Sequence, residues 1–247
     1  MKLALVADLH ANREAVTAVM AHARAQGADR FAFLGDYVGY GADPGWAVDL
    51  VREHVAQGAL AVLGNHDAAA VHGRLLGMVA EARAAIEWTR GRLDAGQLAF
   101  LAALPMSLTE HATLFVHANA WAPGDWEYIE GRGEATRSMQ ATSSPLTVCG
   151  HVHVPMLYHL SDTGKAGEFA PTPGTAVPLS DRRRWLAIPG SAGQPRDGNP
   201  AACYAMFDVA VRALTFHRIA YDHETAAAKV RAAGLPPGLA KRLIDGR

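Results

Sequence analysis

The stretch LGNHDA, residues 63–68, places an amide, an imidazole and a carboxylate directly after the apolar run 60–63. Each of these polar groups is costly to bury without a partner, so their crowding at the end of an expected strand needs an explanation. Matching polar groups at the ends of other strands would provide one, because strands of one sheet can bring distant segments together.

The first half of the chain alternates short apolar runs with helical patterns. We expect strands at the apolar runs 2–7, 30–34, 60–63, 112–116 and 146–149. Helical spacing, caps and stop signals predict helices between Val16 and Gly27, after Asp43, over 68–91 and over 94–103. Strands that alternate with helices in this way are typical of parallel crossover units.

The last third has a different pattern. The apolar runs 185–188, 203–209 and 213–221 are joined by short polar segments, which predicts antiparallel hairpins. An Ala-rich helical pattern follows Asp222 and is interrupted at Pro236 and Pro237. Two long connections, 118–145 and 157–184, are rich in Gly, Pro, Ser and Thr, and loops of this length tend to be functional. We expect one domain over residues 1–247.

The composition narrows the class of protein. Of the 247 residues 50% are hydrophobic and 19% charged, which allows a large core. The net charge of −1 provides no basic footprint, so a nucleic-acid role would need a local patch. The two cysteines, Cys149 and Cys203, fit a reducing compartment. No stretch is long and apolar enough for a signal peptide or a membrane span, so we expect a cytoplasmic protein without membrane contact.

Metal-ligating side chains follow each of the first five expected strands. They are Asp8 and His10, then Asp36, then Asn65, then His117, and finally His151 and His153, while His66 and Asp67 directly follow Asn65. The carboxyl ends of parallel strands converge on one crevice, so we expect these groups to meet there. On an extended backbone the i, i+2 spacing of Asp8 and His10, and of His151 and His153, would place both side chains on one side.

The donor types indicate a metal centre. Seven N and O donors with no thiolate suit Mn, Fe, Zn, Ni or Co, and they exceed what one four-coordinate zinc needs. The number fits two metals that share a carboxylate, an arrangement which, at roughly 3.5–4 Å between the ions, clamps a phosphoryl group during in-line displacement. A lone buried histidine is usually a hydrogen-bonded core residue. Five polar segments that each follow an apolar run are not explained in this way, so we favour a shared site.

The motifs resemble the signature of the calcineurin-like metallophosphoesterase superfamily. Its D-x-H, G-D, G-N-H-[DE], later H and G-H-x-H elements correspond to DLH 8–10, GD 35–36, GNHD 64–67, His117 and GHVH 150–153. The segment IPGSAGQPRDGNP, residues 188–200, is similar to one in small bacterial stand-alone members. The resemblance implies an α/β fold with two mixed β-sheets flanked by helices, a four-layer α-β-β-α sandwich.

The resemblance also implies the role of each residue. Asp8, His10 and His153 would bind the first metal, and Asn65, His117 and His151 the second, with Asp36 bridging the two. A metal-bridging hydroxide would attack the phosphorus. His66 would protonate or stabilise the leaving oxygen, and Asp67 would orient the His66 imidazole.

Weaker signals suggest contacts with the substrate. Asn12 follows the first ligand pair at an expected helix start, where it would contact phosphate or simply cap the helix. Arg196 would contact phosphate or form a surface ion pair. Trp121, Trp126 and Tyr128 would pack the loop after His117 onto the core, which we favour, or stack on a nucleobase.

Three functions remain open at this point. The first is a metal-dependent hydrolase of a phosphodiester or nucleotide-type phosphate. The second is a phosphoprotein phosphatase, but those relatives carry an arginine shortly after the G-D, where this chain has Gly39, Tyr40 and Gly41. The third is a non-catalytic metal-binding scaffold, which usually loses ligands that are all present here. The partner would be a small phosphoester. The oligomeric state is open, with a homodimer through a hairpin edge as one option.

Overall fold

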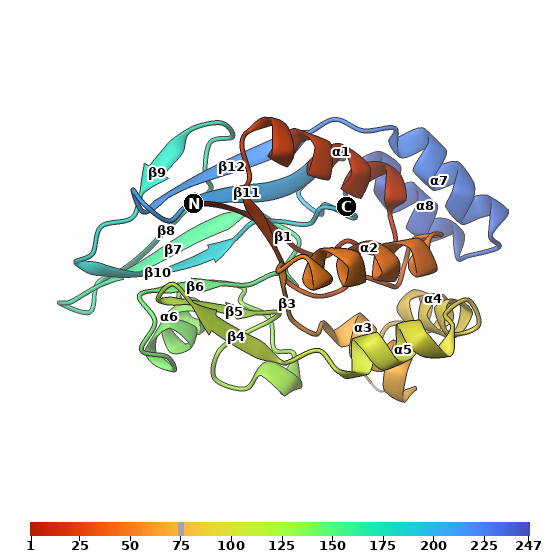
Figure 1. Cartoon of the computed structure of the whole chain (residues 1–247), viewed down its shortest axis with the longest axis horizontal. Helices are drawn as coiled ribbons and strands as arrows, with labels where there is room; N and C mark the ends of the chain where they lie inside the picture. The colour runs from red at the N-terminus through yellow and green to blue at the C-terminus, as the bar shows by residue number, and fades with distance from the viewer. Residues whose placement is uncertain (74–76) are drawn as a thin grey trace.

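Two six-stranded sheets form the centre of the protein in a computed structural model that describes residues 1–73 and 77–247 (Figure 1). The first sheet has the order β3 (Leu60–Ala61), β2 (Arg30–Phe33), β1 (Lys2–Val6), β11 (Ala202–Asp208), β12 (Ala213–Ile219) and β9 (Ala176–Pro178). The second sheet has the order β4 (Ser107–Glu110), β5 (Thr113–Val116), β6 (Leu146–Val148), β10 (Arg183–Ile188), β7 (Met156–Ser161) and β8 (Ala166–Phe169).

The five expected strands of the first half divide between these two sheets. Strands β1, β2 and β3 pair in parallel in the first sheet, and β5 and β6 pair in parallel in the second. The remaining pairings are antiparallel, apart from the parallel pair of β6 with β10. The carboxyl ends of strands from both sheets therefore contribute to the site.

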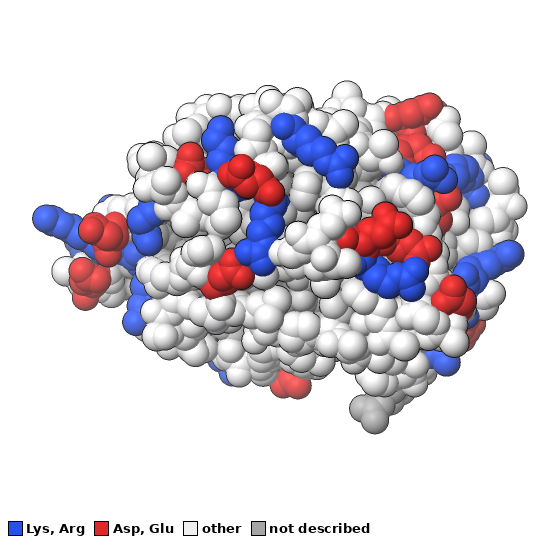
Figure 2. All heavy atoms as spheres, in the orientation of Figure 1, with Lys and Arg blue, Asp and Glu red and all other residues white. Residues whose placement is uncertain are grey.

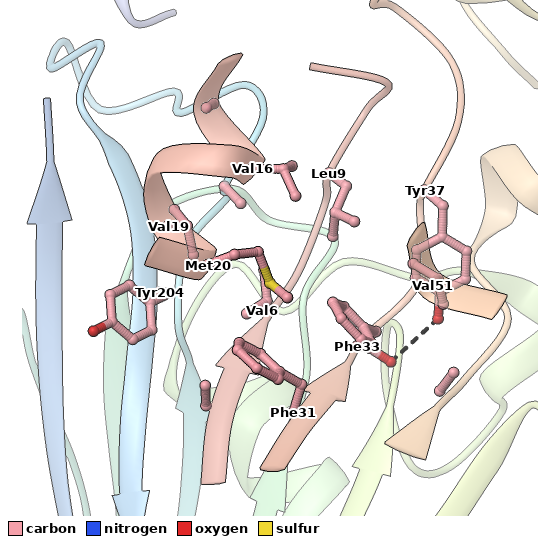
Figure 3. Close-up of a cluster of buried hydrophobic side chains, with 14 of the residues drawn as sticks. Val6, Leu9, Val16, Val19, Met20, Phe31, Phe33, Tyr37, Val51 and Tyr204 are labelled. Atoms are coloured by element: carbon pink, nitrogen blue, oxygen red, sulfur yellow. Dashed lines mark hydrogen bonds between the residues drawn. The ribbon is translucent and has the colours of Figure 1, made fainter. Parts of the chain in front are cut away.

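Helices cover the outer faces of both sheets, which confirms the predicted α/β class and its four layers. Against the first sheet pack α1 (Arg13–Ala25) and α2 (Pro44–Ala56), and Val16, Val19 and Met20 of α1 share one buried cluster with Phe31 and Phe33 (Figure 3). Against the second sheet packs α6 (Arg132–Gln140), through Ala135 and Met139. Between the sheets, alternate residues of β1 and β10 form a continuous apolar core with their neighbours.

A third group of helices packs at one end of the sheets. It consists of α4 (Ala80–Arg90), α7 (His223–Ala232) and α8 (Pro237–Asp245), whose apolar faces share a cluster with Tyr40. Close by lie α3 (Asn65–His72) and α5 (Ala95–Ala102) (Figure 1). In the described part of the chain, no helix is both long and apolar enough to cross a bilayer.

Several sequence expectations differ from the structure. The helix expected over 68–91 is replaced by α3 and α4, and residues 74–76 of that range lie outside the described residues. The expected connection 118–145 contains a 3₁₀ turn at Pro123–Asp125 and α6, and 157–184 contains most of β7 with β8 and β9. Strands β8 and β9 are largely exposed edge strands, so neighbouring strands rather than a buried apolar pattern define them.

Charged side chains of both signs are interspersed on the face seen in Figure 2. Lys and Arg alternate there with Asp and Glu, and no large patch of one sign is present on this face. This distribution agrees with the balanced overall charge.

Truncation of a buried phenylalanine should distinguish the core from the surface. Phe33 is 1% exposed, and we expect Phe33→Ala to lower the free energy of unfolding by about 3–5 kcal/mol. Phe169 is 39% exposed, so Phe169→Ala should cost less than about 1 kcal/mol. Urea denaturation of the two variants measures this difference, and equal losses would contradict the assigned core.

Candidate metal centre

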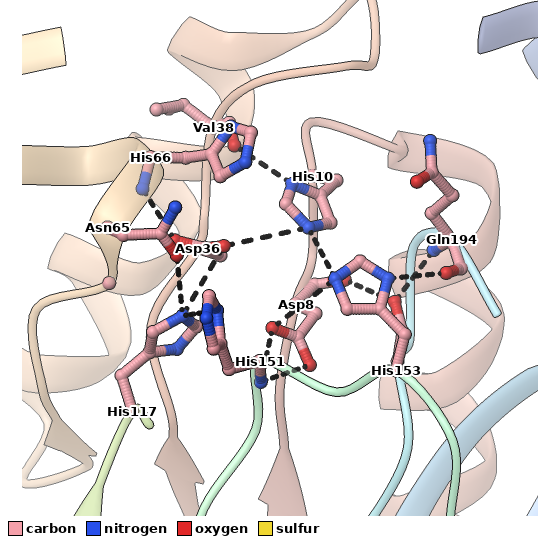
Figure 4. Close-up of polar contacts among 12 residues, drawn as sticks. Asp8, His10, Asp36, Val38, Asn65, His66, His117, His151, His153 and Gln194 are labelled. Atoms are coloured by element: carbon pink, nitrogen blue, oxygen red, sulfur yellow. Dashed lines mark hydrogen bonds and ion pairs between the residues drawn. The ribbon is translucent and has the colours of Figure 1, made fainter. Parts of the chain in front are cut away.

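The seven predicted ligands lie together where strands of the two sheets end (Figure 4). Asp8 and His10 follow β1, Asp36 follows β2, and Asn65 is the first residue of α3. His117 follows β5, and His151 and His153 follow β6. All are buried except Asn65, which is partly exposed. Side chains separated by more than 140 residues of sequence thus share one buried polar site.

Four of the imidazoles are held in a defined tautomer by backbone carbonyls. His10 Nδ1 donates to Val38 O (3.1 Å), His117 Nδ1 to Leu34 O (2.7 Å), His153 Nδ1 to Gln194 O (2.6 Å) and His151 Nε2 to Trp126 O (2.9 Å). A carbonyl can only accept, so each of these nitrogens carries the proton. The opposite nitrogen of each neutral ring is therefore a lone pair, as a metal ligand requires.

These lone pairs point at one another in two couples. His10 Nε2 lies 3.1 Å from His153 Nε2, and His117 Nε2 lies 3.2 Å from His151 Nδ1. The Asn65 Oδ1 atom is 3.0 Å from His117 Nε2. Facing lone pairs at such distances repel unless a proton or a cation lies between them. Each couple belongs to a group that could hold a metal ion, Asp8 with His10 and His153, and Asp36 with His117 and His151.

Asp36 lies between the two couples. Its Oδ2 is 3.8 Å from His10 Nε2 and 3.4 Å from His117 Nε2, while its Oδ1 accepts the backbone N–H of His66 at 2.8 Å. Asp8 lies beside the first couple, with Oδ1 3.8 Å from His153 Nε2. The Asp36 position is the one that a bridging carboxylate would need.

Five of the seven predicted ligands have a left-handed backbone. The φ angles are 54° at Asp8, 45° at His10, 55° at Asp36, 69° at His151 and 66° at His153. The expectation that the two i, i+2 pairs lie on extended backbone is therefore wrong. Non-glycine residues rarely adopt this conformation, and it clusters at functional sites where the surrounding structure imposes it.

Two motif glycines allow the loops to approach each other closely. A Cβ on Gly64 would lie 2.2 Å from Asp36 Oδ1, and a Cβ on Gly35 would lie 2.7 Å from His117 Nδ1. Gly35 also has a φ of +88°, which favours glycine. Any side chain at either position would displace Asp36 or His117.

Asp67 holds the backbone of the Asp36 loop. Its carboxylate accepts N–H bonds from Asp36 (2.8 Å), Tyr37 (2.9 Å), Val38 (3.2 Å) and Gly64 (3.0 Å). Among the described residues no hydrogen bond joins this carboxylate to the His66 imidazole, which the resemblance led us to expect. The geometry gives Asp67 a positioning role toward Asp36 instead.

His66 lies beside the ligands at the start of α3. It is 4% exposed, and its Nδ1 has no hydrogen-bond partner among the described residues. Its ring centroid lies 4.9 Å from that of His10 and 4.5 Å from that of Tyr40. It also forms a possible metal-binding group with His10 and Asp36. Burial lowers the pKa of His66 to about 4.

Asn12 and Arg196 occupy different environments. Asn12 caps α1, since its Oδ1 accepts from Ala15 N (3.2 Å) and its Nδ2 donates to Gly193 O (2.7 Å). The Arg196 guanidinium lies 5.7 Å from the Tyr40 ring centroid, and its Nε is buried without a partner among the described residues. Arg196 therefore retains a donor near the centre, whereas the side chain of Asn12 is committed to the fold.

Aromatic rings surround the ligands, and sequence patterns identified only some of them. The Tyr128 ring stacks on His151 at 4.0 Å, and Trp126 packs edge-on to His117 at 5.8 Å, so both pack onto the site. Tyr40 packs 4.6 Å from His10 and was missed. The Gln194 carbonyl was also missed, because backbone acceptors leave no signature in sequence.

Charges within the site shift its ionisation in the metal-free chain. Burial raises the pKa of Asp8 to about 7. Burial would lower the pKa of His117, but the charge and hydrogen bond of Asp36 raise it to about 9. Burial would likewise raise the pKa of Asp36, but the charge of His117 holds it well below its usual range. Without metal, a proton on His117 takes the place of a cation.

Comparisons with known proteins indicate the family of the chain. Residues 1–212 match the model of the calcineurin-like phosphoesterase superfamily domain. The chain is 32% identical to an uncharacterised protein of Methanocaldococcus jannaschii over 250 residues, covering 99% of this chain and 98% of the other.

Two solved structures are similar over the full chain. A metallophosphoesterase from Sphaerobacter thermophilus is 36% identical with a TM-score of 0.88, covering 100% of this chain and 99% of the other. A hypothetical protein from Pyrococcus horikoshii is 17% identical with a TM-score of 0.79, covering 100% of this chain and 98% of the other. At this identity the similarity is evidence for a shared fold only.

The stability of the metal-free protein should fall above neutral pH. The pKa of His117 is about 9 in the folded chain against 6.5 ordinarily, so its stabilisation is complete below pH 6.5 and lost as pH rises through 9. The expected loss is up to about 3 kcal/mol. Asp8, whose pKa is about 7, contributes a small further loss of stability near neutral pH. The other site imidazoles have lowered pKa values, so they change the stability only below pH 6.5.

Chelator-treated protein unfolded in urea at several pH values measures this effect. His117→Gln should flatten the curve between pH 6.5 and 9, whereas His111→Gln, at an exposed histidine, should leave it unchanged. A flat curve for the unmodified chain would contradict the pairing of His117 with Asp36.

Proposed function

The chain belongs to the calcineurin-like phosphoesterase superfamily, and from this premise we propose that it hydrolyses a phosphodiester or a nucleotide-type phosphate at two metal ions. The metals would be held by Asp8, His10 and His153 on one side and by Asn65, His117 and His151 on the other, with Asp36 shared. The observation that carries the proposal is the two couples of facing imidazole lone pairs on either side of Asp36.

The donor chemistry supports transition-type cations such as Mn, Fe, Zn or Ni. Two such ions, when bound, supply Lewis acidity toward the phosphoryl oxygens and activate water as a nucleophile. The protein fixes where they bind, because each imidazole is oriented by a carbonyl on its other nitrogen. We therefore propose all seven residues as metal ligands.

His66 acts on the leaving oxygen. Its ring is buried beside Asp36 and His10, and its lowered pKa keeps it neutral in the unbound protein. A phosphate that binds nearby brings negative charge, which raises the pKa of the imidazole and favours a proton on the ring. His66 can then donate that proton, or a hydrogen bond, as the ester bond breaks.

Arg196 contacts the substrate phosphate. Its charge acts on several site groups, since it is among the causes that lower the pKa values of His10, His66 and His153. Its Nη2 donates to Gln194 Oε1 at 3.1 Å, which orients the guanidinium, and its buried Nε has no partner among the described residues. The phosphate would pair with the charge of this guanidinium. The contact proposed for Asn12 is weaker, because its side chain already caps α1.

His66→Ala separates catalysis from metal binding. We expect kcat with bis-p-nitrophenyl phosphate to fall by about 100-fold or more, because a proton donor contributes on this scale, while two metals per chain are retained. Asp36→Asn should instead lower the metal content. Initial rates of Mn-reloaded protein and elemental analysis measure both.

The matched control is His111→Ala, at an exposed histidine away from the ligands. It should leave rate and metal content unchanged. Full activity in His66→Ala would refute its assigned role. A panel of substrates tests the scaffold alternative. If metal-loaded wild-type protein hydrolyses none of the members, a non-catalytic scaffold is supported. The panel contains phosphodiesters, phosphomonoesters, cyclic nucleotides, dinucleoside polyphosphates and a phosphopeptide.

Arg196→Gln tests the phosphate contact. Loss of a charge-assisted contact should raise KM about 10-fold for the best substrate of the panel, with a smaller change in kcat. Arg182→Gln, at an exposed turn residue, is the control and should change neither constant. An unchanged KM in Arg196→Gln would assign this arginine to structure alone.

A further inference from the structure

A cleft of about 720 Å³ opens beside the metal centre. Its inner end is formed by Asn65, His66 and His151, which belong to the site already described. One wall comes from α3, the start of α4 and the residues just before it, and the other from the loop that carries Trp126 and Tyr128. Whatever occupies this cleft would be directly adjacent to the reacting phosphate.

The outer walls of the cleft expose apolar side chains. The described residues include six exposed large hydrophobic side chains, and three of these line this one cleft: Val79 is 61% exposed, Met106 40% and Tyr128 45%. Met78 and Ala82 extend the same surface. Scattered exposed apolar residues need no explanation, but a concentration at the mouth of a site marks a binding surface.

The cleft is also poor in charge. Among its described lining residues Asp125 alone carries a full charge, and none is Lys or Arg. A neighbouring hollow along α8 differs, because charged side chains of both signs line it: Arg196, Lys241, Arg242 and Arg247 with Glu81, Asp197 and Asp245. A charged group would find partners of opposite sign there, whereas the cleft beside His66 suits an uncharged group.

We propose that this cleft binds the alcohol portion of the ester, and that the alcohol is an uncharged aryl or branched alkyl group. This inference rests on the proposed phosphoester hydrolysis. It follows from the position of His66, which lines the cleft and would act on the leaving oxygen. The apolar part of the alcohol then extends from His66 toward Val79, Met106 and Tyr128.

The test compares leaving groups of similar acidity but different apolar area. Methyl phosphodiesters of phenol and 4-tert-butylphenol serve for this, because their intrinsic reactivities are close. We expect kcat/KM of the Mn-reloaded enzyme to be about 10-fold higher for the tert-butyl ester, as the added carbons are buried in the cleft. The ester of 4-hydroxybenzoate, with its extra negative charge, should be about 10-fold poorer than the phenyl ester.

Variants locate the preference in the cleft. The double variant Val79→Ser and Met106→Gln removes apolar surface without adding charge, and should reduce the tert-butyl preference to about twofold or less. The control Val211→Ser and Phe169→Gln changes two exposed side chains outside the cleft and should retain the preference. The proposal would be overturned if the wild type hydrolysed the phenyl and tert-butyl esters at equal rates or preferred the carboxylate ester. It would also be overturned if the control variant lost the tert-butyl preference to the same extent.

A binding measurement separates this inference from the proposed function. Saturation-transfer NMR on metal-free protein compares 4-tert-butylphenol with 4-hydroxybenzoate and needs no turnover. The cleft assignment is supported if 4-tert-butylphenol binds selectively and the Val79/Met106 variant loses this binding. If that result is obtained but no ester is hydrolysed, only the proposed hydrolytic function fails. Absence of selective binding would overturn the cleft assignment, whatever the activity.

Discussion

The structure depends on four imidazole nitrogens that face one another in two couples on either side of Asp36. Such an arrangement is unfavourable without positive charge between the nitrogens, so the rest of the fold must hold it in place. It does so through four backbone carbonyls that fix the outer nitrogens, and through Asp67, which accepts hydrogen bonds from the backbone around Asp36. The left-handed residues among the ligands reflect the same constraint.

The two sheets provide the rigidity that these loops need. Apolar residues of both sheets interdigitate between the layers, and helices cover the outer faces. Each ligand follows a strand, or starts a helix after one, so that its main chain is anchored at one end by sheet hydrogen bonds. Strain at a ligand of the order of 1–3 kcal/mol is small beside the burial that fixes the strands.

The sequence allowed the ligands and the fold class to be predicted because both leave strong local patterns. Polar groups directly after apolar runs located all seven proposed ligands, and the alternation of strands and helices indicated α/β. Other features left no such pattern. The edge strands β8 and β9 lack a buried face. The conformation of His10 and His151 follows from close loop packing, and the role of Gln194 belongs to its carbonyl. The partners of Asp67 depend on tertiary structure in the same way.

The hydrogen bonds that hold the loop after β1 have a consequence for biosynthesis. The loop after β1 is held by Ser191, whose Oγ donates to Asp8 O, and by Gly193, whose N–H donates to the same carbonyl. His153 in turn needs the carbonyl of Gln194. Asp8 leaves the ribosome early, but the segment that holds its carbonyl is made about 180 residues later. Folding around Asp8, His10 and His153 is therefore dominated by non-local contacts, and this part of the site cannot form until residues 191–194 have been translated.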